Sequence, residues 1–225
     1  MPELAEDDHD LGPAYTGHGT CGAVILSIGE GNASRIYLTR DAGKSWKPTF
    51  INQEPLAFYD CMAFENDKHG LAMSDPVNGK FRLIETLDGG ASWQMVDPAG
   101  IPAALTGEAG FAASSPKHGV AVGGDFENPT GNGDISSWSE DGGATWKASD
   151  VFPAGYRSGV SWVPGRGKTA IAVVTSGSDY TLDGGRTWKN FDNRTFDAVE
   201  CVGKNVCWAS GSQGRVTKLS LSSSW

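Results

Sequence analysis

The sequence is short of basic residues and has no long apolar run. Its 225 residues include 18 lysines and arginines against 27 aspartates and glutamates, a formal net charge of −9. This balance argues against nucleic acid or an anionic membrane surface as the main partner. No stretch approaches the roughly 18 apolar residues of a membrane span, and no apolar segment of a secretion signal follows Met1. We therefore expect a globular chain with no membrane span.

The motifs of several large enzyme classes are also missing. The chain has no Gly-x-Ser-x-Gly elbow, no phosphate-binding loop and no Gly-x-Gly-x-x-Gly between a strand and a helix. The acidic run from Glu6 to Asp10 has nothing with ligand spacing near it, so it is interpreted as a solvated terminus rather than a metal site. We expect no cofactor.

The chain contains four similar copies of one octapeptide. The copies are Thr39–Trp46, Thr86–Trp93, Ser139–Trp146 and Thr181–Trp188. Self-similarity at a period of about 40 to 50 residues is typical of small sheets in a radial array, one sheet per repeat.

The segments between the octapeptides alternate apolar and polar residues with period two, and Gly, Asn and Asp punctuate them, which predicts strands. No segment shows the pattern of an amphipathic helix. One repeat illustrates the plan with expected strands at 58–64, 71–73, 80–86 and 92–96. Counting gives five small sheets, the first and last incomplete, in an all-β domain over residues 22–225. Since a ring has to protect its end strands, the N-terminal segment 1–21 is a candidate to add a strand to the last sheet.

The octapeptide is best interpreted as a turn. Its Ser/Thr and Asp side chains can accept hydrogen bonds from nearby N–H groups, its glycine permits positive φ, and its Trp buries a large surface. Calcium is the alternative, but each copy has one shared carboxylate, whereas calcium takes about six to eight oxygen ligands. We predict no metal and a structural role for Asp41, Trp46, Asp88, Trp93, Asp141, Trp146, Asp183 and Trp188.

Two of the four cysteines are spaced for a disulfide. Cys201 and Cys207 bracket a Gly-Lys-Asn turn between two short strands, which can bring the sulfurs to bridging distance. The alternative is a reduced pair in an intracellular chain. We predict an extracytoplasmic or secreted protein, with a cytoplasmic location as the alternative.

The octapeptides match the Asp-box, or BNR repeat, written S/T-x-D-x-G-x-[ST]-W. In this the chain resembles the sialidase-like superfamily and the photosystem II assembly factors of the Ycf48/Hcf136 family. The segments at 57–61, 69–76, 107–114 and 156–160 resemble those of the WD40/YVTN/BNR-like secreted proteins of bacteria. The resemblance implies a β-propeller of four-stranded antiparallel blades, about five here where relatives are expected to have seven.

In propellers of this type the Asp-box turns lie on the face opposite the usual binding site. The resemblance therefore implies a binding face formed by loops at the other end of the sheets. The candidates on that face are Tyr59, Asp60, Asp75, Arg82, Glu108, Asp125, Tyr156, Arg157 and Asp197.

Three functions fit these residues. The first is a non-enzymatic binding or scaffold propeller for a protein segment or glycan. The second is a sialidase-like glycoside hydrolase acting on an acidic sugar, and the third is a truncated or engineered array without selected activity.

The hydrolase needs an arginine cluster, a tyrosine activated by a glutamate, and an acid/base aspartate. The right types of side chain are present in Arg82, Arg157, Tyr59, Glu108 and Asp60. However, we cannot place a third arginine on this face. The alternative is that both arginines pair with nearby carboxylates. We therefore favour binding, and expect open blade edges to allow self-association.

Overall fold

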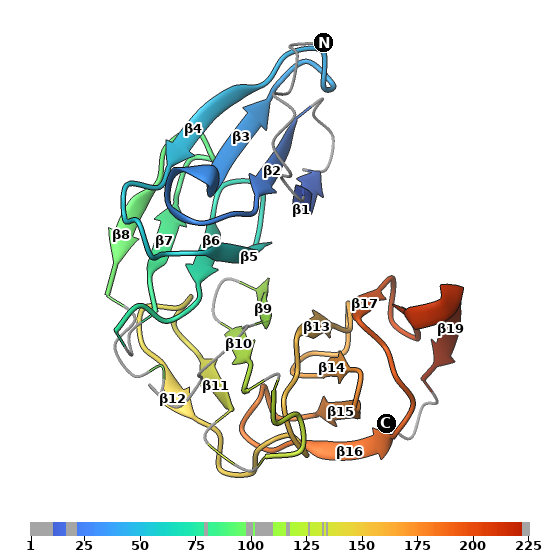
Figure 1. Ribbon diagram of the computed structural model, residues 1–225. Helices are drawn as coiled ribbons and strands as arrows, with labels where there is room; N and C mark the ends of the chain where they lie inside the picture. The colour runs from blue at the N-terminus through green and yellow to red at the C-terminus, as the bar shows by residue number, and fades with distance from the viewer. Residues whose placement is uncertain are drawn as a thin grey trace. The chain divides into compact units, whose positions relative to one another are not determined.

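In the part of the chain that the computed structural model describes, the residues form five antiparallel β-sheets and two short 3-10 helices, η1 (Gly31–Ala33) and η2 (Ser212–Gly214) (Figure 1). The described residues are 11–16, 22–78, 81–97, 101, 110–115, 118–125, 127–131, 133 and 135–221, with the backbone alone for 11–16 and 110–115. In this described part, no helix is both long enough and apolar enough to cross a membrane. The all-β class and the count of five sheets, both predicted from the sequence, are confirmed.

The chain divides into two compact units, residues 1–97 and 98–225. Unit 1 holds two four-stranded sheets, each with its strands in sequence order. The strands of the first sheet are β1 (Leu11–Thr16), β2 (Ala23–Ser27), β3 (Arg35–Thr39) and β4 (Lys47–Ile51). Those of the second are β5 (Tyr59–Phe64), β6 (Gly70–Ser74), β7 (Leu83–Thr86) and β8 (Gln94–Val96).

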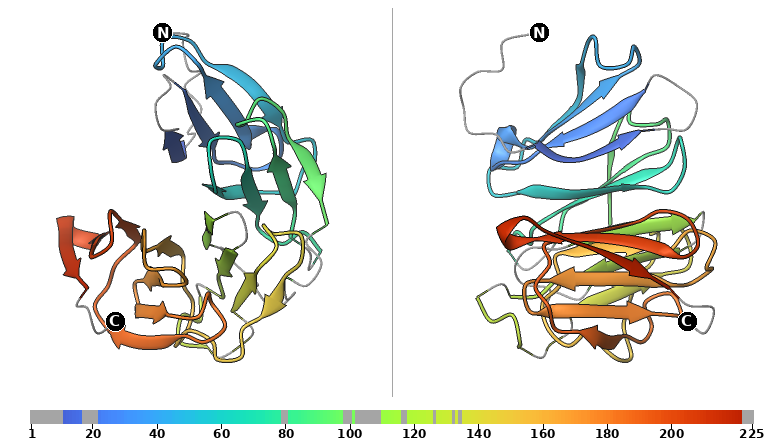
Figure 2. Two further views of the ribbon diagram at one scale, coloured as in Figure 1. Left: turned by 180° about the vertical axis from the view of Figure 1, so that it is seen from behind. Right: turned by 90° about the vertical axis from the view of Figure 1, so that its right-hand side faces the viewer.

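Unit 2 holds three sheets. The strands of the first two are β9 (Gly110–Ser115), β10 (His118–Val122), β11 (Ser136–Ser139), β12 (Lys147–Ala148), β13 (Gly159–Trp162), β14 (Ala170–Val174), β15 (Gly177–Thr181) and β16 (Lys189–Asp192). The last sheet has three strands, β17 (Ala198–Cys201), β18 (Val206–Gly211) and β19 (Arg215–Ser220). Within each unit, neighbouring sheets lie next to each other (Figure 2), and shared clusters of apolar side chains join them.

Strand β1 corrects one expectation about the N-terminal segment. It pairs with β2 in the first sheet, with Tyr15 opposite Val24 and Thr16 opposite Ala23. Residues 11–16 therefore complete their own sheet rather than adding to the last one, and the first sheet has four strands. The Gly-Pro pair within β1 hid this strand from the sequence pattern, since both residues are poor strand formers.

The four octapeptides form the same hydrogen-bonded turn between the third and fourth strands of a sheet. In the last copy, the Thr181 hydroxyl accepts from the N–H of Gly185 (2.9 Å) and donates to Asp183 Oδ1 (2.8 Å). Asp183 in turn accepts from the N–H of Thr187 (2.9 Å) and from its hydroxyl (2.6 Å). The other copies repeat these contacts. Each aspartate thus accepts three hydrogen bonds from its own turn.

In the second and fourth copies, the fifth position of the octapeptide is glycine for two reasons. Its φ is positive, +83° at Gly90 and +91° at Gly185. It also packs on the preceding sheet, where a Cβ would come within 2.8 Å of Val24 in the first case and 2.4 Å of Val120 in the second. A larger residue would therefore strain the backbone and push neighbouring sheets apart.

Candidate functional site

Strand register puts the candidate residues of unit 1 at one end of the β5–β8 sheet. Gly70 pairs with Thr86 beside the octapeptide turn, whereas Tyr59 pairs with Ser74 at the other end. Asp75 follows β6 and Arg82 precedes β7 at that same end. These residues lie at the end of the sheet opposite the octapeptide turn.

The candidates of unit 2 lie at the corresponding ends of their sheets. Arg157 and Tyr156 precede β13, Asp197 precedes β17, and Asp125 follows β10. The remaining candidate, Glu108, lies outside the described residues. The structure thus presents two sets of candidates, one in each unit.

In unit 1, Arg82 is engaged by a carboxylate of the chain itself. Its Nε lies 2.5 Å from Glu54 Oε2, and its Nη2 lies 2.5 Å from Glu54 Oε1, a two-point ion pair. The hydrogen bond from Arg82 lowers the pKa of the Glu54 carboxyl and raises the pKa of the guanidinium. Both side chains are partly exposed, so the pair lies at the surface with its charges already matched.

Tyr59 belongs to the core of unit 1. Its side chain is 1% exposed, its ring packs edge-on against Phe50 with centroids 5.4 Å apart, and its hydroxyl lies 3.8 Å from Met95 Sδ. Burial raises the pKa of the phenol well above its usual value. A buried, neutral phenol is poorly suited to attack a sugar, so the role of Tyr59 in this structure is packing.

Asp60 and Asp75 are half-buried, and both carry charge close enough to Cys61 to affect its thiol. Burial raises the pKa of the Cys61 thiol, and the charges of the two aspartates raise it further. A neutral thiol is a weak nucleophile and a weak metal ligand. In the described ranges, no group of three or more His, Cys, Asp or Glu side chains could hold a metal ion.

In unit 2, Arg157 forms an ion pair that is closed to solvent. Its side chain is 0% exposed and that of Asp179 is 1% exposed. Arg157 Nε donates to Asp179 Oδ2 at 2.6 Å, Nη2 contacts the same oxygen, and Nη1 donates to the Tyr156 carbonyl at 2.6 Å. Burial lowers the pKa of Arg157, and the charge of Asp179 opposes this shift.

The remaining candidates of unit 2 differ in access. Tyr156 is buried, and its N–H donates to the Pro129 carbonyl at 3.0 Å. Asp125 and Asp197 are exposed. One carboxylate oxygen of Asp125 accepts from the N–H of Glu127 at 2.9 Å. Among the described candidates of unit 2, these two aspartates are therefore the ones that a partner can reach.

Sequence reasoning missed Glu54 and Asp179, the partners of the two arginines. Glu54 stands in the polar segment before β5, where nothing marks it. Asp179 stands in β15 between buried Ser178 and half-buried Tyr180, and a carboxylate in a buried strand is a usable signal, because such groups are rarely buried unless paired. The spacing of residues in the sequence does not show which arginine each of these two carboxylates would pair with.

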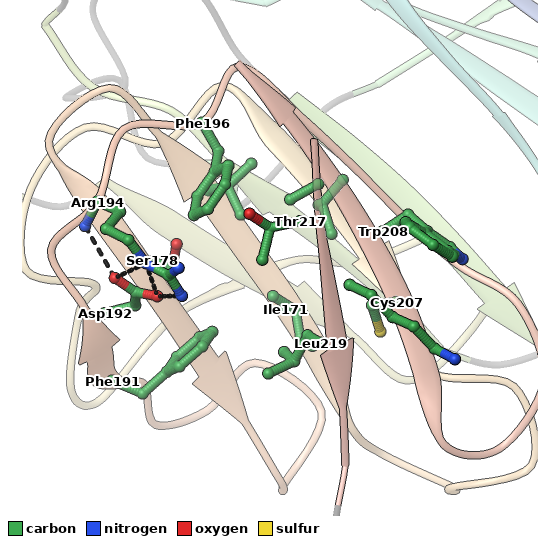
Figure 3. Close-up of a pocket in the computed structure, with 14 residues that line it drawn as sticks. Ile171, Ser178, Phe191, Asp192, Arg194, Phe196, Cys207, Trp208, Thr217 and Leu219 are labelled. Carbon is green, nitrogen blue, oxygen red and sulfur yellow. Dashed lines mark hydrogen bonds and ion pairs between the residues drawn. The ribbon is translucent and has the colours of Figure 1, made fainter. Parts of the chain in front are cut away.

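The structure also contains a cavity that the sequence did not indicate. It lies in unit 2 between the β13–β16 and β17–β19 sheets and has a volume of about 40 Å³. Mostly apolar side chains line it, among them Ile171, Phe191 and Leu219, and the polar Thr217 also borders it (Figure 3). Arg194 and Asp192 lie beside it as an ion pair at 2.6 Å.

Comparison with known proteins identifies the fold. No protein family matches the sequence, and no curated protein is significantly similar to it. Solved structures do match. A structure of YCF48 bound to D1 peptide superposes with a TM-score of 0.62 at 16% identity, covering 97% of this chain and 68% of that one. YCF48 from Cyanidioschyzon merolae has the same TM-score and identity, with 96% and 69% covered.

An enzyme is also among the matches. An ancestral GH74 enzyme superposes with a TM-score of 0.60 at 16% identity, and the match covers 91% of this chain but only 28% of that enzyme. Likeness at this level of identity establishes fold. The chain has a β-propeller fold like that of YCF48, and its described residues form five antiparallel blades, four of them four-stranded.

Proposed function

We propose that the chain is a non-enzymatic binding propeller that recognises a polypeptide segment at the sheet ends opposite its Asp-box turns. The observation that carries this proposal is the state of the two arginines. Arg82 is paired with Glu54, and Arg157 is buried against Asp179. A hydrolase that binds an acidic sugar needs guanidinium groups open to the substrate carboxylate.

The accessible carboxylates favour a basic segment as the ligand. In unit 2, Asp125 and Asp197 are exposed at the sheet ends opposite the octapeptide turns. The chain as a whole carries a formal net charge of −9. Complementary charge raises association rates and selects partners. The structure of YCF48 with a D1 peptide shows that a propeller of this fold can bind a polypeptide.

An extracytoplasmic location is part of the proposal. Its support is the disulfide between Cys201 and Cys207, which joins paired positions of β17 and β18. Disulfides persist in oxidising compartments and are rare in the cytosol. Counting oxidised and reduced thiols by mass spectrometry, in protein taken from its native source under alkylating conditions, tests this.

The function is tested by presenting the same protein to a random 12-residue peptide library and to a glycan array. We expect peptides rich in Lys and Arg to be selected, with affinity falling as salt rises. Asp197→Asn and Asp125→Asn together should weaken these peptides several-fold, while Asp41→Asn, in a turn at the other end of a sheet, should not. Binding to glycans alone, or release of an acidic sugar from any of them, would exclude the proposal.

A further inference from the structure

The loop that carries Asp125 is the longest connection between a second and a third strand. It spans residues 123–135, between β10 and β11, whereas the corresponding segments of the other sheets are 28–34, 75–82, 175–176 and 212–214. The structure describes residues 123–125, 127–131, 133 and 135 of this loop. Loops held on a rigid scaffold commonly carry binding residues, so the contacts that hold this loop bear on the proposed function.

Backbone hydrogen bonds tie the loop to the segment before β13. The N–H of Tyr156 donates to the Pro129 carbonyl at 3.0 Å, and the N–H of Arg157 donates to the Gly123 carbonyl at 3.1 Å. A hydroxyl between β14 and β15, that of Ser176, donates to the same Pro129 carbonyl at 3.3 Å. The loop is therefore held at two points, one on each side of its exposed carboxylate.

The loop and the segment before β13 also approach each other closely. A Cβ on Gly155 would lie 2.2 Å from the Pro129 carbonyl oxygen, and a Cβ on Gly124 would lie 3.0 Å from the Cα of Tyr156. Both glycines have positive φ, +141° and +132°. The place of the loop is therefore set directly by the place of the backbone before β13.

The buried ion pair holds that backbone in turn. Arg157 Nε donates to Asp179 Oδ2 at 2.6 Å, and Asp179 Oδ1 accepts from the N–H of Ala154 at 3.2 Å. Arg157 Nη1 donates to the Tyr156 carbonyl at 2.6 Å and to the Ser176 hydroxyl at 3.3 Å. The pair thus fixes the backbone on both sides of its glycine, together with the hydroxyl that reaches the loop.

A buried ion pair adds little to stability compared with apolar side chains of similar volume. The desolvation of the two charges offsets much of their attraction, and apolar replacements of both partners are often as stable or more so. Apolar side chains could not accept from the N–H of Ala154 or donate to the Tyr156 carbonyl. What the pair supplies here is therefore a defined position for the backbone.

We propose that Arg157 is a positioning residue for ligand binding, which acts through Asp179 to hold the loop that presents Asp125 to the partner polypeptide. The inference rests on the proposed function, in which Asp125 contacts a basic segment. Arg157 itself does not touch the ligand, since its side chain is 0% exposed. A loop already held in its binding conformation binds more tightly, because less ordering is needed when the ligand arrives.

The double variant Arg157→Met with Asp179→Leu separates positioning from stability. It leaves no buried charge, so the chain should keep most of its stability, but it removes the bonds to the Ala154 N–H and the Tyr156 carbonyl. Arg157→Lys is the second variant, in case the double variant does not fold. It keeps a charge opposite Asp179 and has one nitrogen in place of the three that make these contacts.

Gly185→Ala is the matched control, because it destabilises the chain from an octapeptide turn, at the other end of a sheet. A fluorescent Lys- and Arg-rich peptide selected from the library is titrated with each protein and followed by anisotropy. Amide exchange is measured by NMR on the same proteins without peptide, at a temperature at which all are folded.

We expect the double variant to bind the peptide about fivefold more weakly, as for a loop that is in its binding conformation about a fifth of the time. Gly185→Ala should bind the peptide like the wild type. When Asp125→Asn is already present, the double variant should cause no further loss of affinity, because positioning acts through that carboxylate. Without peptide, the amides of residues 156 and 157 should exchange about tenfold faster through local opening of the loop, while those of β14 change no more than in Gly185→Ala.

Equal affinity of the wild type and the folded double variant would overturn the proposal. Unchanged exchange at residues 156 and 157 would do so too, as would a loss of affinity that persists in full beside Asp125→Asn. An equal loss in Gly185→Ala would show that the pair only stabilises the chain. The proposed function fails by a different result, the absence of any basic peptide that binds the wild type, and the positioning role would fail with it.

Discussion

The buried pair of Arg157 and Asp179 allows the sharpest prediction about stability. Asp179→Asn keeps the shape of the side chain and removes its charge, which leaves a guanidinium that is 0% exposed without a counter-ion. Arg157 retains its bond to the Tyr156 carbonyl (2.6 Å) and a longer one to the Ser176 hydroxyl (3.3 Å). Neither of these groups carries charge.

The expected cost is large for a chain of this size. Removing one partner of a buried ion pair costs about 3–5 kcal/mol, against total stabilities of about 5–15 kcal/mol. At about 2–4 °C per kcal/mol for 150–250 residues, the midpoint of thermal unfolding should fall by about 10 °C. Urea unfolding followed by tryptophan fluorescence gives the free-energy change, and calorimetry gives the midpoint.

Two controls separate a buried charge from a merely altered residue. The double variant Arg157→Met with Asp179→Leu should be less destabilised than Asp179→Asn, because no charge is left buried. Arg194→Met, which breaks a pair whose arginine side chain is 59% exposed, should cost at most about 1 kcal/mol. The reasoning is refuted if Asp179→Asn costs under about 1 kcal/mol, or if the double variant is the least stable of the three.

Three further predictions concern the turns and the disulfide. Gly185→Ala should lower the free energy of unfolding in urea by about 2–4 kcal/mol, because of the positive φ and the overpacking of a Cβ. Gly203→Ala is the control, since a Cβ there meets nothing within 4 Å, and it should lower this free energy by about 1 kcal/mol. Equal losses in the two variants would contradict the packing argument. Burial raises the pKa of the Asp183 carboxyl, but hydrogen bonds in its turn outweigh burial and lower the pKa below 3.8. The ionised carboxylate therefore stabilises the fold above pH 3.8, and this contribution is lost as the pH falls below that value. A wild-type acid-unfolding curve that matches the curve of Asp183→Asn would refute the assignment. Replacing both Cys201 and Cys207 by Ser should cost about 2 kcal/mol, as expected for so short a loop, and an unchanged urea midpoint would contradict this.

The fold was largely predictable from the sequence because its repeat is local. The octapeptide specifies a turn within eight residues, and strands with period-two alternation flank it, so sheet number and strand order follow from counting. The first strand escaped detection, since its Gly-Pro pair contradicts strand propensity and only pairing with β2 stabilises it.

The candidate site was predictable in position but not in chemistry. Tyr59, Arg82 and Arg157 lie at the sheet ends where the repeat plan puts them, yet Tyr59 and Arg157 are buried and both arginines are paired. The partner of each arginine lies more than twenty residues away in sequence, in a segment with no motif. Such pairing depends on tertiary packing, which residue type and spacing do not reveal.

Amide chemical shifts measured by NMR test the central claim most directly, namely that this propeller binds a basic polypeptide segment at the sheet ends opposite its octapeptide turns. Spectra are recorded for the protein alone and with a saturating Lys- and Arg-rich peptide selected from the library. The account predicts shift changes at Asp125 and Asp197, which are exposed at those sheet ends, and little change at Asp41 and Asp183 in the turns. Unchanged shifts at Asp125 and Asp197 at saturation, or larger changes at the turns, would contradict it.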